Sequence, residues 1–313
     1  MSQLGGVAFV FPGQGSQKVG MGRNLYDTYE SARGVFLEAD KILGFALSRL
    51  CFEGPEEELR LTINAQPALV AVSLACYSAA LSQSLALKRQ LIVPAYVAGH
   101  SLGEYTALAI AGVLDYSTTI HLARERGRLM FEAGQKQAGA MAAILGLDEA
   151  LVVQICHNTG TWLANINCPG QLVISGAKEN IDAAVALAKS SGATRALPLQ
   201  VSGAFHTPLM QPAAEGLSAI IERLPFQEPK IPIIANTTAR PLTSSHAIKE
   251  ELLVQLTHSV QWQKSIETLI AVGTTTFIEI GPGNVLNGLI KRIDKNAKTL
   301  NISGVDDLSN LFE

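Results

Sequence analysis

The residues around Ser101 have types and a spacing that favour nucleophilic chemistry. Ser101 is the central residue of GHSLG (99–103), which fits the pattern GxSxG. An extended apolar run at 91–98 precedes the pattern, and a helix-favouring run at 102–111 follows it. A serine on a sharp turn from strand to helix presents its hydroxyl to the outside, and glycines let the two flanking elements approach closely. GxSxG alone is a weak pattern, but in this setting it predicts a nucleophile elbow.

The same turn offers a place for negative charge. The first amides of the predicted helix have no partner within the helix, so they and the helix dipole could stabilise an oxyanion beside Ser101. A second source of such amides is the glycine-rich loop 13–18, which follows a predicted strand at 7–11. Lys18 stands where a GxGxxG loop needs its third glycine, and no GxxxxGK[ST] occurs, so a nucleotide site is disfavoured. We therefore expect backbone amides of this loop to point at a reacting group.

Arg126 lies on the apolar face of a predicted helix at 117–131. At 100° per residue the other polar residues of this helix share one arc, whereas Arg126 falls between Leu122 and Met130 on the apolar arc. One interpretation is a snorkelling arginine or a structural ion pair. The other is a buried guanidinium that binds a substrate carboxylate in bidentate fashion. The pattern leaves both interpretations open.

His206 is the candidate general base. It lies in a loop that follows a predicted strand at 194–201 and precedes a helix, where it could face Ser101. A structural role is the alternative, because histidines in loops are usually structural. His100 is the neighbour of Ser101 in the chain and cannot easily fold back onto the hydroxyl.

Composition limits the class of protein. The chain has 313 residues, 48% of them hydrophobic and 16% charged, with a formal net charge of -3. It can bury a large core, as one large domain or two unequal ones, and its charge gives no sign of nucleic-acid binding. The apolar run at 7–11 is too short for a secretory signal, and polar residues interrupt the apolar segment 67–87, which predicts a buried helix. We expect a soluble cytoplasmic protein.

The four cysteines offer no obvious metal or disulfide site. They are scattered, form no CxxC pair and lie mostly in apolar surroundings. Buried reduced thiols are therefore expected, and no metal ligand is assigned.

Between 138 and 200 the pattern changes from long helices to short alternating elements. Apolar runs at 141–147, 162–168, 171–176 and 194–201 are typical of strands, and 148–157 and 179–190 are typical of helices. The order is βαββαβ, the split arrangement of ferredoxin-like domains. We predict an inserted domain at 135–202 and a discontinuous catalytic domain at 1–134 and 203–313. A strand at 276–280 and a helix that ends at 293 belong to the latter.

Five motifs occur in the order known from one family. They are GHSLGEY at 99–105, FPGQGSQ at 11–17, GAFHT at 203–207, QW at 261–262 and GPGNVL at 281–286. With these motifs the chain resembles the malonyl-CoA:acyl carrier protein transacylases over nearly its whole length. The resemblance implies an α/β fold, in which an α/β-hydrolase-like core with a parallel sheet carries a smaller ferredoxin-like α+β domain that closes over the site.

The resemblance also implies a role for each matching residue. Ser101 resembles the acylated nucleophile, and His206 resembles its base. The backbone amides of Gln14 and Leu102 match the oxyanion hole. The remaining implied roles are binding of the malonyl carboxylate by Arg126, crowding of a 2-methyl branch by Phe205, substrate contact by His100, and orientation of the histidine by the backbone carbonyl of Gln261.

In the implied reaction Ser101 takes the malonyl group from malonyl-CoA, and the phosphopantetheine thiol of acyl carrier protein then takes it from Ser101. This ping-pong transfer serves fatty acid or polyketide biosynthesis and needs no cofactor, because malonyl-CoA is a substrate. The expected partners are malonyl-CoA and acyl carrier protein, without nucleic acid or membrane, and a monomer is expected. A basic cluster is predicted to help dock the acidic carrier protein, with a solvated surface as the alternative; its members are Lys291, Arg292, Lys295 and Lys298.

Two other classes of function stay open. An esterase or thioesterase can use the same elbow, but such enzymes have their histidine late in the chain, and here none follows His258. The other class is a catalytically silent module that binds a carrier protein. The presence of Ser101, His206 and Arg126 together argues against it.

Overall fold

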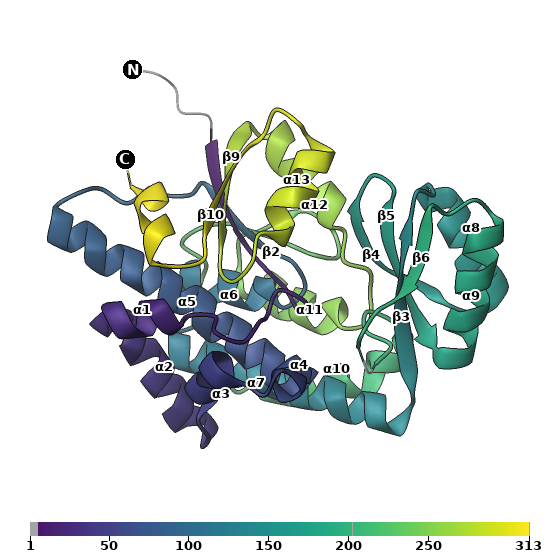
Figure 1. The fold of residues 1–313 in the computed structure, drawn as a ribbon, viewed down its shortest axis with the longest axis horizontal. Coiled ribbons are helices and arrows are strands. Elements are labelled where there is room, and N and C mark those ends of the chain that lie inside the picture. Colours follow the sequence, from purple (N-terminus) through teal and green to yellow (C-terminus); the bar gives the residue numbers. More distant parts are fainter. Residues whose placement is uncertain (1–5, 202, 313) are drawn as a thin grey trace.

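A computed structural model describes residues 6–201 and 203–312 of the protein and contains two β-sheets (Figure 1). The larger sheet has the strand order β10-β9-β1-β2-β7-β8. Its neighbouring strands are parallel, except that β8 is antiparallel to β7. The strands are β1 (Gly6–Phe11), β2 (Tyr96–Gly99), β7 (Ile233–Ile234), β8 (Pro241–Leu242), β9 (Thr274–Ile280) and β10 (Lys298–Ile302).

Helices cover both faces of the larger sheet (Figure 1). The helices of this body are α1 (Arg23–Thr28), α2 (Glu30–Leu43), α3 (Leu47–Glu53), α4 (Glu56–Arg60), α5 (Thr62–Leu87), α6 (Gly103–Ile110), α7 (Tyr116–Lys136), α10 (Gln211–Ile221), α11 (Ser245–Gln255), α12 (Trp262–Ala271) and α13 (Val285–Ile293), with 3-10 helices η1 (Pro208–Met210) and η2 (Val305–Leu311). Helices α2, α5 and α7 contribute to one core with Phe9 and Phe11 of β1. Helices α12 and α13 contribute to a second core with Ala8 and Val10.

β1 is a central strand because both of its faces are covered. Its residues Ala8 to Phe11 are fully buried and alternate between the two cores. A continuous apolar run is typical of such a strand. The strand predicted at 7–11 is confirmed and begins one residue earlier.

β2 is shorter than the strand predicted at 91–98. It covers only Tyr96–Gly99, and Leu91 instead forms an isolated bridge with Phe312. Pro94 lies between these two segments and has no backbone N–H to donate to a neighbouring strand. The first half of the predicted strand is therefore wrong, while its last residues lead directly into the turn at Ser101.

Helix α5 is the longest helix of the protein's described residues, and it begins before the predicted start at 67. It includes Pro67, which has no N–H to donate to the carbonyl of Ile63 one turn earlier. That carbonyl accepts a hydrogen bond from Arg124 Nη1 at 2.8 Å instead. The helix is long and apolar enough to cross a membrane, but 67% of its most apolar window is buried inside the protein, as in the core helix of a soluble protein.

The smaller sheet has the ferredoxin-like arrangement that was predicted. Its strand order is β4-β5-β3-β6 with antiparallel neighbours, and two helices pack on it to form a third core. Its elements are β3 (Gly139–Leu145), α8 (Glu149–Thr159), β4 (Trp162–Cys168), β5 (Gln171–Ala177), α9 (Lys178–Ser190) and β6 (Arg195–Pro198). The α/β fold class is confirmed, whereas the domain limits at 134/135 and 202/203 stay predictions. The four cysteines are free and buried, as expected.

Candidate active site

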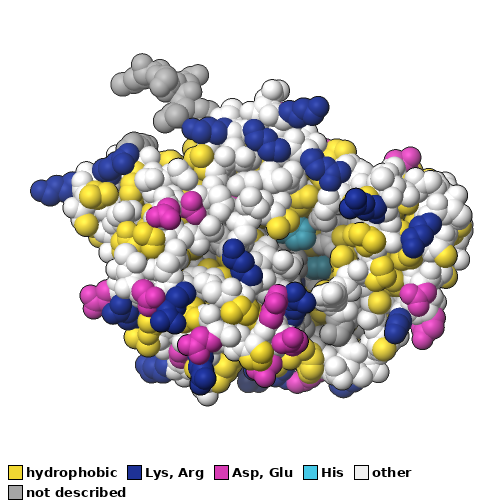
Figure 2. Space-filling model, in the orientation of Figure 1, with side chains coloured by type: hydrophobic (Ala, Val, Ile, Leu, Met, Phe, Trp, Pro, Cys, Tyr) yellow, Lys and Arg dark blue, Asp and Glu magenta, His cyan; other side chains and the backbone are white. Residues whose placement is uncertain are grey.

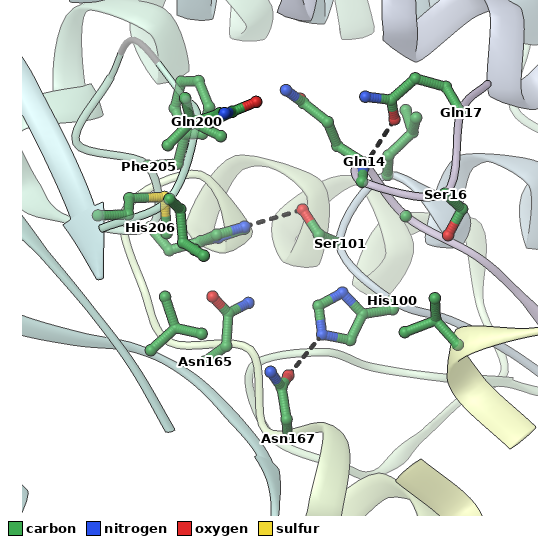
Figure 3. Close-up of a pocket in the computed structure, with 18 of the residues that line it drawn as sticks. Gln14, Ser16, Gln17, His100, Ser101, Asn165, Asn167, Gln200, Phe205 and His206 are labelled. Carbon is green, nitrogen blue, oxygen red and sulfur yellow. Dashed lines mark hydrogen bonds between the residues drawn. The ribbon is translucent and has the colours of Figure 1, made fainter. Parts of the chain in front are cut away.

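Two loops that carry candidate functional residues meet at one end of the larger sheet. β1 and β2 are parallel neighbours with Phe11 paired to Gly99, so the loop after β1 and the turn after β2 leave the sheet together. They border a cavity of about 410 Å³ that β4 and β5 of the smaller sheet also line. Figure 2 shows the molecule hollowed at this place, with histidine side chains inside the hollow. Figure 3 shows His206 pointing toward Ser101 within the cavity.

Ser101 lies on a tight turn between β2 and α6. Its φ angle is +51°, in the left-handed region, where a residue with a side chain carries about 1–3 kcal/mol of strain. A Cβ atom on Gly99 would lie 1.8 Å from the carbonyl carbon of Gly103. A Cβ atom on Gly103 would lie 2.0 Å from the carbonyl oxygen of Phe11. Ser101 therefore has the predicted setting between strand and helix, and the two glycines are what makes the turn possible.

His206 reaches Ser101 from a distant part of the chain. Its Nε2 atom lies 2.8 Å from Ser101 Oγ, and its Nδ1 atom lies 2.8 Å from the backbone oxygen of Gln255. A carbonyl oxygen can only accept, so Nδ1 carries the proton and Nε2 is free to accept from the serine hydroxyl. Burial, followed by the positive charge of Arg126, lowers the pKa of His206 to about 3. The imidazole is therefore neutral at pH 7, as a general base must be before it takes a proton.

The carbonyl that orients His206 belongs to Gln255, so the prediction of Gln261 was wrong. Gln255 is the last residue of α11, and the last carbonyls of a helix have no partner within the helix. Its carbonyl is therefore free to accept from His206. Gln261 is the N-cap residue of α12, and its carbonyl accepts the first helical hydrogen bond from Ser265 N at 2.9 Å.

Arg126 is buried beside Ser101, with 1% of its surface exposed. Its Nη1 atom donates to Gln66 Oε1 at 2.8 Å. Its Nη2 atom donates to Gln255 Oε1 at 2.8 Å and to Ser101 Oγ at 3.1 Å. The guanidinium carbon lies 5.1 Å from the ring centre of Tyr105. Within the described residues no carboxylate forms an ion pair with Arg126, and its Nε atom has no hydrogen-bond partner.

This environment excludes both structural interpretations of Arg126. A snorkelling arginine keeps its charged head in water, whereas this guanidinium is buried. A structural ion pair needs a carboxylate partner, whereas the described hydrogen-bond partners here are neutral oxygens. Burial of the unpaired charge lowers the pKa of Arg126 below its usual range. The arrangement can bind an anion in the cavity beside the serine hydroxyl.

Gln14 and Leu102 both line the same cavity. Neither backbone amide donates to an acceptor in the part of the chain that the structure describes. The loop of Gln14 touches the turn of Ser101, because a Cβ atom on Gly13 would lie 2.4 Å from the carbonyl oxygen of His100. The two amides thus come from adjoining loops, as a pair of oxyanion donors requires.

Phe205 and His100 also line the cavity. Phe205 is buried next to His206 in the chain. His100 Nε2 lies 2.8 Å from Asn167 Oδ1 of the smaller sheet (Figure 3). The ring centre of His100 lies 5.5 Å from that of Trp262. Burial lowers the pKa of His100, so the ring that contacts Asn167 is a neutral side chain.

Two residues that support the turn were not predicted from the sequence. Asn236 Oδ1 accepts from Ser101 N at 2.7 Å, and Asn236 Nδ2 donates to Gly99 O at 2.7 Å. Glu104, buried at the start of α6, accepts from Asn236 N at 3.0 Å and from Gln255 Nε2. Burial, and then the nearby charge of Glu251, raise the pKa of Glu104 well above its usual value. Glu104 follows GHSLG directly, but no local signal pointed to Asn236, which lies 135 residues after Ser101.

Comparisons with known proteins all identify acyl transferases as the relatives of this chain. The acyl transferase domain family matches residues 8–305. The chain is 46% identical over 302 residues to the malonyl CoA-acyl carrier protein transacylase of Bacillus subtilis (strain 168), covering 95% of this chain and 93% of the relative. It is 42% identical over 306 residues to the protein of that name in Escherichia coli (strain K12), covering 96% of each.

Solved structures give the same result. An acyl carrier protein S-malonyltransferase from Vibrio cholerae O1 biovar eltor superposes with a TM-score of 0.91 at 41% identity, covering 97% of this chain and 99% of that chain. A malonyl-transacylase solved in complex with its type II polyketide synthase acyl-carrier protein superposes with a TM-score of 0.92 at 39% identity, covering 98% and 99%.

Proposed function

Since this chain belongs to the acyl transferase family, among the malonyl CoA-acyl carrier protein transacylases, it transfers malonyl groups to acyl carrier protein, and we propose that Ser101 and His206 carry out the transfer. One observation supports the assignment above the others: Ser101 Oγ lies 2.8 Å from His206 Nε2 and 3.1 Å from Arg126 Nη2. A nucleophile, a base and a buried cation thus share one cavity. We further propose that the turn of Ser101 acts as a nucleophile elbow.

In the first half-reaction His206 Nε2 takes the proton of Ser101 Oγ as the oxygen attacks the thioester carbonyl of malonyl-CoA. The backbone amides of Gln14 and Leu102 stabilise the resulting oxyanion. The carbon–sulfur bond then breaks, and the coenzyme A sulfur takes the proton from His206. Ser101 is left as a malonyl ester.

In the second half-reaction the phosphopantetheine thiol of the carrier protein gives its proton to His206 and attacks the malonyl-serine carbonyl. The carbon–oxygen bond of the ester breaks, and Ser101 Oγ recovers a proton from His206. A carboxylate behind the histidine is unnecessary, because a thiolate is a good leaving group and the Gln255 carbonyl already fixes the tautomer. No cofactor takes part in either step.

Arg126 is proposed to bind the free carboxylate of the malonyl group. Its Nε atom is without a partner among the described residues, and its Nη2 atom faces Ser101. A planar guanidinium binds a carboxylate through two parallel hydrogen bonds, which would place the thioester carbonyl beside the serine. Phe205 and His100 are proposed to shape the same cavity around the malonyl group.

The experiment that tests this function is acylation with isotopically labelled malonyl-CoA, followed by mass spectrometry of the protein. The wild type should carry one malonyl group on Ser101 and pass it to holo acyl carrier protein. Ser101→Ala should carry none, while its unfolding curve stays close to that of the wild type. Release of the label to water in the presence of carrier protein would indicate a hydrolase. Absence of any adduct on the wild type would indicate a catalytically silent module.

The carrier protein is proposed to dock on the rim of the hollow near α13. Lys291, Arg292, Lys295 and Lys298 are all exposed there, and Figure 2 shows lysine and arginine side chains above the hollow. Arg292 also donates to Gln171 Oε1 and to the Pro169 carbonyl, so it joins α13 to the smaller sheet. We propose that the enzyme works in the cytoplasm as a monomer, in fatty acid or polyketide synthesis, and without contact to membrane or nucleic acid.

A further inference from the structure

A chain of hydrogen bonds runs from Arg126 to the loop of Gln14 along α5. Arg126 Nη1 donates to Gln66 Oε1 at 2.8 Å, and Gln66 Nε2 donates to Thr62 Oγ1 at 2.9 Å. Thr62 Oγ1 in turn donates to Gln14 Oε1 at 2.8 Å. Thr62 and Gln66 are four residues apart on α5, so their side chains project from the same face of the helix. Both are buried, Thr62 with 7% and Gln66 with 0% of the surface exposed.

Chemistry determines the directions of the first two bonds in this chain. A guanidinium has donors only, so Gln66 must present its oxygen to Arg126. The amide nitrogen of Gln66 then faces Thr62, whose hydroxyl oxygen must accept. The single hydroxyl proton of Thr62 stays available, and it is donated to Gln14 Oε1. The guanidinium of Arg126 therefore sets the orientation of the Gln66 amide, and the chain of bonds continues from there to Gln14.

This last bond ties the Gln14 side chain to α5. Gly15, at the tip of the loop, has φ +105° and no atom within 4 Å of the position its Cβ would occupy, and its N–H donates to Gln17 Oε1 within the same loop at 2.7 Å. Among the described residues, Thr62 is the one hydrogen-bond partner of the Gln14 side chain. Figure 3 shows Gln14 among the residues that line the cavity with Ser101. Loss of the Thr62 hydroxyl would therefore release the Gln14 side chain.

We propose that Thr62 is a positioning residue for acylation: its hydroxyl holds Gln14 so that the Gln14 backbone amide points at the oxyanion. Through Gln66 the same hydroxyl ties this amide to Arg126, which fixes the distance between the carboxylate site and the oxyanion site before substrate binds. The inference rests on the proposed function, in which the Gln14 amide is an oxyanion donor and Arg126 binds the malonyl carboxylate.

Thr62→Val tests the proposal, because valine keeps the shape of threonine and removes the hydroxyl. Single-turnover acylation by malonyl-CoA should slow by about 10-fold, less than the 10² to 10³ that follows complete loss of an oxyanion donor. The malonyl-CoA concentration at half-maximal rate should change by less than about 2-fold, because Arg126 still binds the carboxylate. Thr62→Ser restores the hydroxyl without the methyl group and should acylate within about 2-fold of the wild type.

Thr119→Val is the matched control. Thr119 is fully buried on α7, and its hydroxyl donates to the backbone oxygen of Asp115 rather than to the site. It should acylate at the wild-type rate, which shows that a buried valine does not slow the enzyme in general. In the Gln14→Ala background, Thr62→Val should cause no further loss, because the side chain that Thr62 holds is already gone.

Three results would overturn the role of Thr62: a wild-type acylation rate for Thr62→Val, an equal loss for Thr62→Ser, or a loss confined to the half-maximal concentration. Each of them leaves malonyl-Ser101 intact in the mass spectrum of the wild type. Absence of that adduct in the wild type would instead contradict the proposed function, so the two failures are distinguishable.

Discussion

At the scale of single residues, Arg126 is the most informative side chain of the site. Its hydrogen-bond partners among the described residues are the neutral oxygens of Gln66, Gln255 and Ser101. The buried carboxyl of Glu104 acts on it electrostatically, but the pKa of Glu104 is itself raised well above its usual value, so this carboxyl is a weak counter-charge. A buried charge without a counter-charge destabilises a protein unless a ligand supplies one. The carboxylate of the malonyl group would do so, because it enters the cavity with the thioester.

Arg126→Ala should change the choice of substrate. Loss of one partner of a buried, hydrogen-bonded charge pair costs roughly 2–5 kcal/mol, so kcat/KM for malonyl-CoA should fall by ~10²-fold or more. Acetyl-CoA has no free carboxylate, and its kcat/KM should stay equal or rise because the unpaired charge is gone. Steady-state kinetics with both thioesters measures the ratio. An equal fall for both would mean that Arg126 only supports the structure.

His206 should give acylation an unusual pH dependence. Burial and Arg126 lower its pKa to about 3, so the neutral base persists from pH 8 down to pH 5. The single-turnover acylation rate should therefore be constant over this range, without the decline near pH 6.5 of an ordinary histidine. An acylation rate that falls with a midpoint between pH 6 and 7 would contradict the lowered pKa of His206.

The same lowered pKa affects stability with a defined sign. Below about pH 6.5 His206 is protonated in the unfolded chain, whereas in the folded protein it stays neutral until the pH approaches 3. His206 therefore makes no contribution above that pH, and it lowers the free energy of unfolding progressively as the pH falls toward 3.

At the scale of elements, helix ends and one turn hold the side chains of the candidate site. The C-terminal end of α11 supplies the carbonyl for His206, and the N-terminal end of α6 supplies the Leu102 amide. Both groups lack partners within their helices, which is why they are available to a substrate or a histidine. The turn between β2 and α6 brings Ser101 to the same point only because Gly99 and Gly103 have no side chains.

Gly99→Ala should open this turn. The new methyl group would lie 1.8 Å from the carbonyl carbon of Gly103, a backbone atom that cannot rotate away. We expect a loss of about 1–3 kcal/mol or more in the free energy of unfolding, with loss of acylation. Urea unfolding measures the change in the free energy of unfolding.

Gly34→Ala is the matched control for the turn. Gly34 lies within α2, and its Cβ position has no atom within 4 Å. The change should stabilise the protein by roughly 0.5–1 kcal/mol, because alanine favours a helix interior over glycine. Equal effects of the two substitutions would show that the close contact at Gly99 is not what holds the turn.

At the scale of the whole molecule, the cavity lies between the two sheets, and contacts on two sides join them. Arg292 of α13 donates to Gln171 and Pro169 beside β5, and Arg60 of α4 donates to Gln200 after β6 at 2.9 Å. His100 and Asn167 form a third link inside the cavity at 2.8 Å. The smaller sheet is therefore a wall of the site as well as a separate core.

The basic cluster near α13 should affect binding of the carrier protein but not acylation by malonyl-CoA. The double change Lys291→Glu and Lys295→Glu leaves the Arg292 contacts in place and reverses two exposed charges. It should raise KM for holo carrier protein, more at low than at high salt, with an unchanged rate of acylation by malonyl-CoA. Lys41→Glu, on α2, is the control and should alter neither quantity. An unchanged KM at low salt would leave these lysines as solvated surface.

The sequence by itself determined much of the protein. Local patterns predicted the βαββαβ order of the smaller sheet, the strand at 7–11 and the setting of Ser101, because periodicity, glycines and turns act over a few residues. Helical geometry also placed Arg126 on a buried face. Because of Pro67, the start of α5 was predicted too late in the chain. The Ile63 carbonyl that Pro67 leaves without a helical partner accepts a hydrogen bond from Arg124 of another helix, so the helix can begin earlier.

Only the tertiary structure decided how these parts meet. His206 lies 105 residues after Ser101, Gln255 lies 49 residues after His206, and Asn236 lies 135 residues after Ser101. The sequence alone does not distinguish the carbonyl of Gln255 from that of Gln261. They differ because Gln255 ends α11, whereas Gln261 is the N-cap residue of α12. A carbonyl at a helix end is free to hold a histidine, and a carbonyl at a helix start is already bonded, so the packing of helix ends determined the site.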